Sequence, residues 1–134
     1  MDYLSPELNV NTVGSVSILG LAHVGDAVFE LLVRTYLISS GHKASQDLHR
    51  STVAIVNAPT QHLFFEKIRD LLNEEEFSVY KRGRNAKVNS VPHNSTEAEY
   101  HSATGLEALF GWLYLMNRQD RINELFSAGM NTNA

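Results

Sequence analysis

The sequence predicts an all-α protein. Apolar residues recur at helical spacing in successive stretches, while the strict alternation typical of strands is almost absent. Capping residues and glycines stand where these stretches begin and end. With 43% apolar and 19% charged residues and only 8 Gly and 3 Pro, the composition is that of a folded chain. At 134 residues, we expect one domain over residues 1–134.

The first long helix is expected over residues 19–40. Its apolar positions are Leu21, Val24, Val28, Leu31 and Leu32. Gly41 follows as a left-handed C-cap. Ahead of this helix, residues 2–11 are typical of a loop in which Pro6 opens a short helical turn.

Two helices should follow in the middle of the chain. Ser45 predicts an N-cap for a helix over residues 46–57, whose inner face includes Leu48, Val53 and Val56. Pro59 fits the first turn of the next helix. Its apolar positions are Leu63, Phe64, Ile68, Leu71 and Leu72.

The second half begins with a capping-box pattern, because Asn73 is followed three residues later by Glu76. We therefore expect a helix over residues 74–82 and an irregular segment over residues 83–95. Asn94 or Ser95 should cap the next helix, which breaks near Ser102 and continues over residues 103–116. A last helix over residues 120–128 should end at Gly129, and the tail from residue 130 to 134 should fray.

Composition excludes several classes of function. There are no cysteines, so disulfides, thiolate metal sites and cysteine nucleophiles are absent. The six histidines lack zinc-site spacing, and neither a Gly-rich phosphate loop nor a GxSxG elbow occurs. The start has no signal-peptide pattern and no apolar run has membrane-spanning length, so we expect a cytoplasmic protein without membrane contact.

Two carboxylates stand in matching surroundings. Asp26 lies within the apolar pattern of the first long helix, between Gly25 and Ala27, where we expect a packed and partly dry setting. A buried carboxylate must be protonated, paired or bound to a cation. Glu107 is the one charge in an apolar run and is likewise flanked by small residues. Facing each other, the two acids would chelate Mg²⁺ or Mn²⁺; the alternative is that each is an ordinary half-exposed helix acid.

Basic residues gather at the end of the helix over residues 74–82. Four of the eleven in the chain lie within seven positions, and they are Lys81, Arg82, Arg84 and Lys87. On a chain of net charge -4, this cluster indicates contact with a phosphate backbone. The alternative is a solvated C-terminus that the helix dipole favours, since three glutamates stand at the other end.

Three segments together resemble the catalytic domain of the ribonuclease III family. Residues 24–28 read Val-Gly-Asp-Ala-Val, and residues 106–111 read Leu-Glu-Ala-Leu-Phe-Gly. A looser match runs from Asp47 through Arg50 to Asn57. The chain ends soon after the matched region, where a standard ribonuclease III continues into a double-stranded-RNA-binding domain. The chain is therefore most similar to the stand-alone Mini-III ribonucleases of bacteria.

The resemblance implies an all-helical ribonuclease III-like homodimer that cleaves double-stranded RNA with Mg²⁺, for which Mn²⁺ substitutes. Asp26 and Glu107 would be the catalytic metal ligands. Asp47, Arg50, Asn57 and the basic cluster would bind RNA. The implied substrate is the precursor of the large-subunit (23S) ribosomal RNA, with a ribosomal protein bound to that precursor as a further partner.

The chain departs from the wider family at two acidic positions. Ala22 stands four residues before Asp26, and Thr104 three residues before Glu107, where the family pattern has acids. Water, an RNA phosphate or another acid would then complete the metal's ligands. Glu30, one helical turn after Asp26, is a candidate by spacing and equally a surface acid.

Two other functions are compatible with the sequence. A non-catalytic double-stranded-RNA-binding module would keep the fold after losing metal ligands, as Ala22 and Thr104 suggest. A structural interaction protein would use Phe110, Trp112 and Tyr114 as a partner surface. We favour core and dimer contact for these three aromatic residues.

Overall fold

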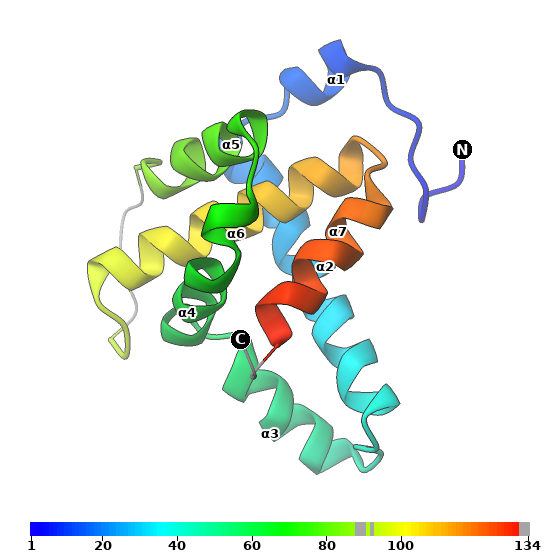
Figure 1. Ribbon diagram of the computed structural model, residues 1–134, viewed down its shortest axis with the longest axis vertical. Coiled ribbons are helices and arrows are strands. Elements are labelled where there is room, and N and C mark those ends of the chain that lie inside the picture. Colours follow the sequence, from blue (N-terminus) through cyan, green and yellow to red (C-terminus); the bar gives the residue numbers. More distant parts are fainter. Residues whose placement is uncertain (88–90, 92, 132–134) are drawn as a thin grey trace.

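The computed structural model describes residues 1–87, 91 and 93–131, and the regular structure within them is helical throughout (Figure 1). The α-helices are α1 (Val10–Gly14), α2 (Ile18–Ser39), α3 (Ser45–Ile55), α4 (Ala58–Ile68), α5 (Glu74–Arg84), α6 (Glu97–Leu115) and α7 (Gln119–Met130). A single 3-10 turn, η1 (Arg69–Leu71), follows α4. The prediction of an all-α fold is confirmed.

Helix α6 lies at the centre, with α2, α4, α5 and α7 packed around it (Figure 1). Every residue from Ser102 to Leu113 is buried except Glu107. Phe110 and Trp112 are therefore core residues, as we favoured, and their contact with a second copy stays a prediction. The burial of its neighbours leaves Glu107 as the one partly exposed side chain on this part of the central helix.

Two glycines let α2 and α6 cross with their backbones in contact. A Cβ atom built on Gly25 would lie 1.6 Å from the carbonyl oxygen of Glu107, and one on Gly111 would lie 1.9 Å from that of Leu21. No side chain fits at such distances. The crossing point is therefore fixed next to Asp26 on one helix and at Glu107 on the other.

Four phenylalanines fill the space where α2, α4, α6 and α7 meet. Phe29 makes edge contacts with Phe64 and Phe110, at ring-centroid distances of 5.1 and 5.6 Å, and also with Phe126 at 6.0 Å. Edge-to-face pairs of this kind add about 0.5–1.5 kcal/mol each beyond the burial of area. This cluster holds the central crossing rigid from the side of α7.

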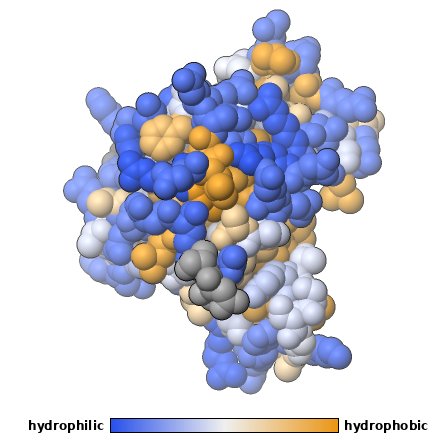
Figure 2. Space-filling view, viewed as in Figure 1, coloured by the Kyte–Doolittle hydropathy of each residue, from blue (hydrophilic) through white to orange (hydrophobic). Residues whose placement is uncertain are grey.

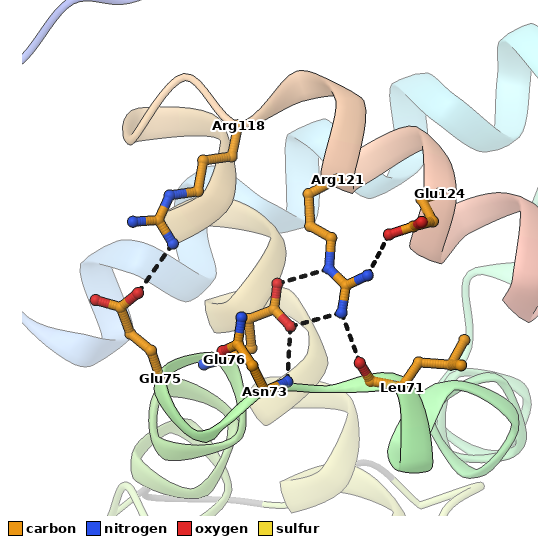
Figure 3. A network of polar contacts seen from close by, with 7 residues as sticks. All are labelled: Leu71, Asn73, Glu75, Glu76, Arg118, Arg121 and Glu124. Atoms are coloured by element: carbon orange, nitrogen blue, oxygen red, sulfur yellow. Dashed lines mark hydrogen bonds and ion pairs between the residues drawn. The ribbon is translucent and has the colours of Figure 1, made fainter.

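A buried ion pair joins α5 to α7 (Figure 3). The guanidinium of Arg121 donates to both carboxylate oxygens of Glu76, at 2.7 and 2.8 Å, and to the carbonyl of Leu71 at 2.6 Å. Glu76 also accepts from the backbone of Asn73 in the predicted capping box. Although burial raises the pKa of Glu76, these hydrogen bonds hold it below its usual value. The glutamate is therefore ionised and fully paired.

Local helix signals were predictive at several ends. Gly41 adopts a φ of 107° after α2, and the backbone of His42 donates to the carbonyl of Leu37 at 3.0 Å, as in a Schellman motif. The capping box at Asn73 is present, and proline stands in the first turn of α4. These predictions needed only neighbours in the chain.

Other predicted ends were wrong. Ser45 is the first residue of α3 and does not cap it, and Pro6 opens no turn because α1 begins later, after Asn9. The cap of α6 is Thr96, whose capping box with Glu99 outcompetes Asn94 and Ser95. Helix α6 does not break at residue 102.

The reason that α6 continues lies in the partners of Ser102. Its hydroxyl lies 2.9 Å from Nδ1 of His62 and 2.9 Å from the hydroxyl of Tyr80, so it does not compete for the helix backbone. Helix α5 also extends two residues further than predicted, to Arg84, and α7 extends to Met130. The predicted irregular segment and frayed tail lie partly outside the described residues, at positions 88–90, 92 and 132–134.

Several apolar residues that we assigned to inner faces are exposed. They are Leu31, Val53, Leu63 and Leu71. In α2 the buried face instead follows Ala22, Gly25, Phe29 and Val33, at steps of three or four residues. The true face is therefore rotated relative to the predicted one, because small residues that pack closely carry no hydrophobic signal.

The visible surface is mostly hydrophilic, with apolar side chains in scattered patches (Figure 2). None of the helices within residues 1–87, 91 and 93–131 combines the length and the apolar character needed to cross a bilayer. The expected cytoplasmic location and the single domain over the whole chain stay predictions.

Candidate active site

The structure brings Asp26 and Glu107 together at the crossing of α2 and α6. The two side chains lie within hydrogen-bonding reach of each other, although they stand far apart in the sequence. Their surroundings differ from our expectation, because Asp26 is exposed and Glu107 is the more buried of the two. Asp26 lies one position round the helix from Gly25, which places it at the rim of the packed interface and outside it.

Glu107 has a strongly perturbed acidity. Burial raises its pKa first, the negative charge of Asp26 and a hydrogen bond to Asp26 raise it further, and the side chain of Gln61 opposes them, so that the pKa is about 8. Two carboxyl groups this close hold one proton between them at neutral pH unless a positive charge replaces it. The pair is therefore suited to bind a cation.

A cleft of about 590 Å³ opens beside Glu107. Its walls come from the end of α3, the start of α4, the segment before α6 and the outward side of α6. Polar residues of the lining are Asn57, Gln61, Asn94, Ser95, Tyr100 and Thr104. The cleft gives a ligand access to the half-buried carboxyl group from solvent.

The comparisons with known proteins agree with this geometry. The family model described as "Ribonuclease III domain" matches residues 19–118, which include all of α2 but its first residue, all of α6 and both carboxylates. The chain belongs to the ribonuclease III family. A "Mini-ribonuclease 3" from Clostridium tetani is 38% identical over 130 residues, covering 96% of this chain and 86% of the relative. A second, from Enterococcus faecalis, is 40% identical over 111 residues, covering 81% and 84%.

A solved structure supports the same assignment. The crystal structure of a protein from Fusobacterium nucleatum matches this chain with a TM-score of 0.79 and 34% identity, covering 87% of this chain and 94% of the other. The similarity to the Mini-III branch that the motifs predicted is therefore confirmed. This ribonuclease III domain is an endoribonuclease.

At the two positions where the wider ribonuclease III pattern has acids, the side chains of this chain offer no carboxylate to a metal. Ala22 is buried, and the buried hydroxyl of Thr104 donates to the carbonyl of Tyr100 at 3.1 Å. Glu30 pairs with Arg34 at 2.8 Å on the surface of α2. No group of three or more histidine or acidic side chains suited to a metal occurs in the part of the chain that the structure describes. Asp26 and Glu107 are the two acids that remain.

Two of the predicted RNA-binding residues, Asp47 and Arg50, lie one turn apart on α3, and the third, Asn57, stands between α3 and α4. Asp47 accepts a hydrogen bond from His42 at 2.7 Å, which lowers its pKa, and Arg50 is exposed. Asn57 lines the cleft, but its amide caps α4 by accepting from Thr60 and donating to two carbonyls of α3. A structural role is thus visible for Asn57, and RNA contact at all three stays a prediction.

The basic cluster lies outside the cleft at the end of α5. Nζ of Lys81 lies 5.1 Å from the centre of the Phe77 ring, and the guanidinium of Arg84 lies 5.7 Å from that of Tyr80. Arg82 and Lys87 are exposed. Two of the four cations, Lys81 and Arg84, therefore lie against aromatic rings of their own helix, and phosphate contact by the cluster stays a prediction.

The sequence analysis did not single out Gln61, a buried residue of α4 whose side chain lowers the pKa of Glu107. A signal was present, because Gln61 precedes Phe64, Phe65 and Ile68 at helical spacing and so shares their buried face. We had assigned Leu63 to the inner face of this helix, but Leu63 is exposed, so the predicted face did not include Gln61.

Proposed function

We propose that this chain is a Mg²⁺-dependent endoribonuclease that hydrolyses double-stranded RNA. The observation that carries the proposal is the pairing of Asp26 with Glu107, which lines a cleft, in a chain of the ribonuclease III family. Paired carboxylate oxygens are the donors that Mg²⁺ and Mn²⁺ prefer. The donor set therefore fits the metal that the family implies.

Each carboxylate has a distinct part. Asp26, exposed at the rim, remains accessible to solvent and substrate, while Glu107 is held at the half-buried wall of the cleft. Glu107 must release its proton for a cation to bind, so the affinity for the cation should rise with pH up to about pH 8. When bound, the ion supplies positive charge that acidifies water and offsets the charge that develops on the scissile phosphate.

Affinity for the duplex would come from basic side chains outside the cleft. The supported cations Lys81 and Arg84, with Arg82 and Lys87, offer a phosphate-binding surface at the end of α5. Arg50 and Asp47 on α3 would contact the same backbone. Recognition of this kind reads the A-form shape of RNA more than its sequence.

We further propose that the enzyme acts as a homodimer. The outer side of α2 carries exposed apolar side chains, Leu19 and Leu31 among them, which a second copy would cover. Two sites related by a two-fold axis would each cut one strand of the duplex. Sedimentation equilibrium tests the dimer, and a monomer at micromolar concentration would contradict it.

The proposed substrate is the precursor of the 23S ribosomal RNA in the cytoplasm, with a ribosomal protein bound to it. Support comes from the similarity to bacterial proteins named Mini-ribonuclease 3. Incubation with a precursor transcript, with and without the ribosomal proteins that bind it, should give discrete ends. Uniform degradation of that transcript would contradict this part of the proposal.

Cleavage of a blunt RNA duplex tests the central activity. The wild-type protein should cut it with Mg²⁺, fail with EDTA, and leave duplex DNA intact. Asp26→Asn and Glu107→Gln should each abolish cleavage while the duplex is still bound. Full activity of either variant would reject its role, and duplex binding by the wild type without cleavage would favour the non-catalytic module.

A further inference from the structure

Helix α4 presents one polar side chain on its buried face. Gln61 is only 5% exposed, and it shares that face with the core residues Phe64, Phe65 and Ile68. A buried amide without a partner costs about 1–3 kcal/mol in proteins. A partner is at hand, because Gln61 and Glu107 line the same cleft and the side chain of Gln61 lowers the pKa of Glu107.

The backbone just before Gln61 is anchored at the start of α4. The side chain of Asn57 accepts from the backbone of Thr60 at 3.0 Å and donates to the carbonyls of Val53 and Ala54 at 2.9 and 3.0 Å. The backbone of Gln61 then donates to the carbonyl of Asn57 at 2.9 Å. The first turn of α4 is thus fastened to the end of α3, and Gln61 projects from a fixed point.

Few other groups can orient Glu107. Gln61 and Glu107 line the same cleft, and Asp26 and Gln61 are the described side chains that shift the pKa of the Glu107 carboxyl group. The nearby hydroxyl of Thr104 is committed to the backbone of Tyr100, and Ala22 has no polar group. The amide of Gln61 is neutral and lowers the pKa of Glu107, so it can hold the ionised carboxylate without adding charge.

We propose that Gln61 is a positioning residue, whose amide donates to the Glu107 carboxylate and holds it toward Asp26 so that both present oxygens to one divalent cation. This inference rests on the proposed function. A neutral donor suits the task, because it restrains an ionised carboxylate without competing for the cation. It also accounts for how a site with two acids keeps a defined geometry after two of the usual four are replaced.

Two variants separate positioning from space filling. Gln61→Met conserves volume and removes the donor, whereas Gln61→Asn keeps the donor and shortens its reach. The matched control is Gln46→Met, the same change at an exposed glutamine on α3. Mn²⁺ affinity of the RNA-free protein is measured by calorimetry, and kcat and KM are measured with a blunt RNA duplex.

Both Gln61 variants should bind Mn²⁺ about tenfold more weakly, the loss typical of a group that orients a metal ligand. Their kcat should fall by a similar factor, and KM for RNA should stay within about twofold, because the lost interaction acts on the reacting site. Gln46→Met should match the wild type. Urea unfolding confirms that each variant is folded.

Wild-type Mn²⁺ affinity and kcat in folded Gln61→Met would overturn the inference, since a space-filling role needs only volume. That result is distinguishable from failure of the proposed function. If Asp26→Asn and Glu107→Gln kept full cleavage, the metal site itself would be wrong. If those two variants lost cleavage while Gln61→Met did not, the positioning role alone would fail.

Discussion

Glu107 should make the cation-free protein less stable as the pH rises. Burial and then the charge of Asp26 raise its pKa from 4.5 to about 8 in the folded protein. Between these values the folded carboxyl group keeps a proton that the unfolded chain has released, so the free energy of unfolding falls with pH. Below pH 4.5 both states are protonated and there is no penalty; above about pH 8 the penalty is complete.

The size of the effect follows from the same interval. Each pH unit costs about 1.4 kcal/mol, so the whole interval sets an upper limit of about 5 kcal/mol. Because Asp26 is exposed and water reaches the cleft, we expect about 2–3 kcal/mol of this limit. Glu107→Gln removes the ionisation and should recover that amount at high pH.

Urea unfolding in EDTA at about pH 5 and about pH 8.5 measures this difference. Relative to the wild type, Glu107→Gln should gain stability at the higher pH, whereas the control Glu7→Gln, at an exposed carboxylate, should not. Addition of Mn²⁺ at high pH should stabilise the wild type and not the variant. Identical pH dependence in wild type and Glu107→Gln would refute the reasoning.

Three further changes test the fold and the RNA surface. Gly25→Ala drives a Cβ into the backbone of α6 and should lower the free energy of unfolding in urea by about 3 kcal/mol or more. The control Gly14→Ala, with open space around it, should be tolerated. Equal stability of the two variants would contradict the close contact between the backbones of α2 and α6. Arg121→Met leaves a buried carboxylate unpaired and should lower the free energy of unfolding by about 3–5 kcal/mol, and a loss below about 1 kcal/mol would show that the pair is dispensable. The third change replaces three basic residues by alanine, Arg82, Arg84 and Lys87. It should weaken duplex binding and reduce the slope of log affinity against log salt by about two to three; an unchanged slope would argue against phosphate contact.

Features that depend on near neighbours could be predicted from the sequence. The turn at Gly41 and the capping box at Asn73 are local, because each needs only a few adjacent residues. Ser102, inside α6, shows the limit of such signals. Ser102 looks like a helix breaker, yet partners from α4 and α5 occupy its hydroxyl, and these come from distant parts of the chain.

The candidate site was predictable in its residues and only partly in its physics. The small-residue notches pointed to Asp26 and Glu107, the two acids that the structure brings together, and Gly25 of the first notch does permit the close crossing. Their metal-binding role stays a prediction. Which of the two would be buried depends on the rotation of α2 about its axis, and the small residues Ala22 and Gly25 gave that rotation no hydrophobic signal. Gln61 was missed because we assigned Leu63 to the inner face of α4, although Leu63 is exposed and Gln61 is buried.

Mn²⁺ binding to four proteins, the wild type, Asp26→Asn, Glu107→Gln and the double variant, tests most directly whether the two carboxylates hold one cation. If they share it, each single change should abolish nearly as much affinity as both together, so the losses should not add. Additive losses, or a single variant that binds Mn²⁺ as tightly as the wild type, would contradict a shared site.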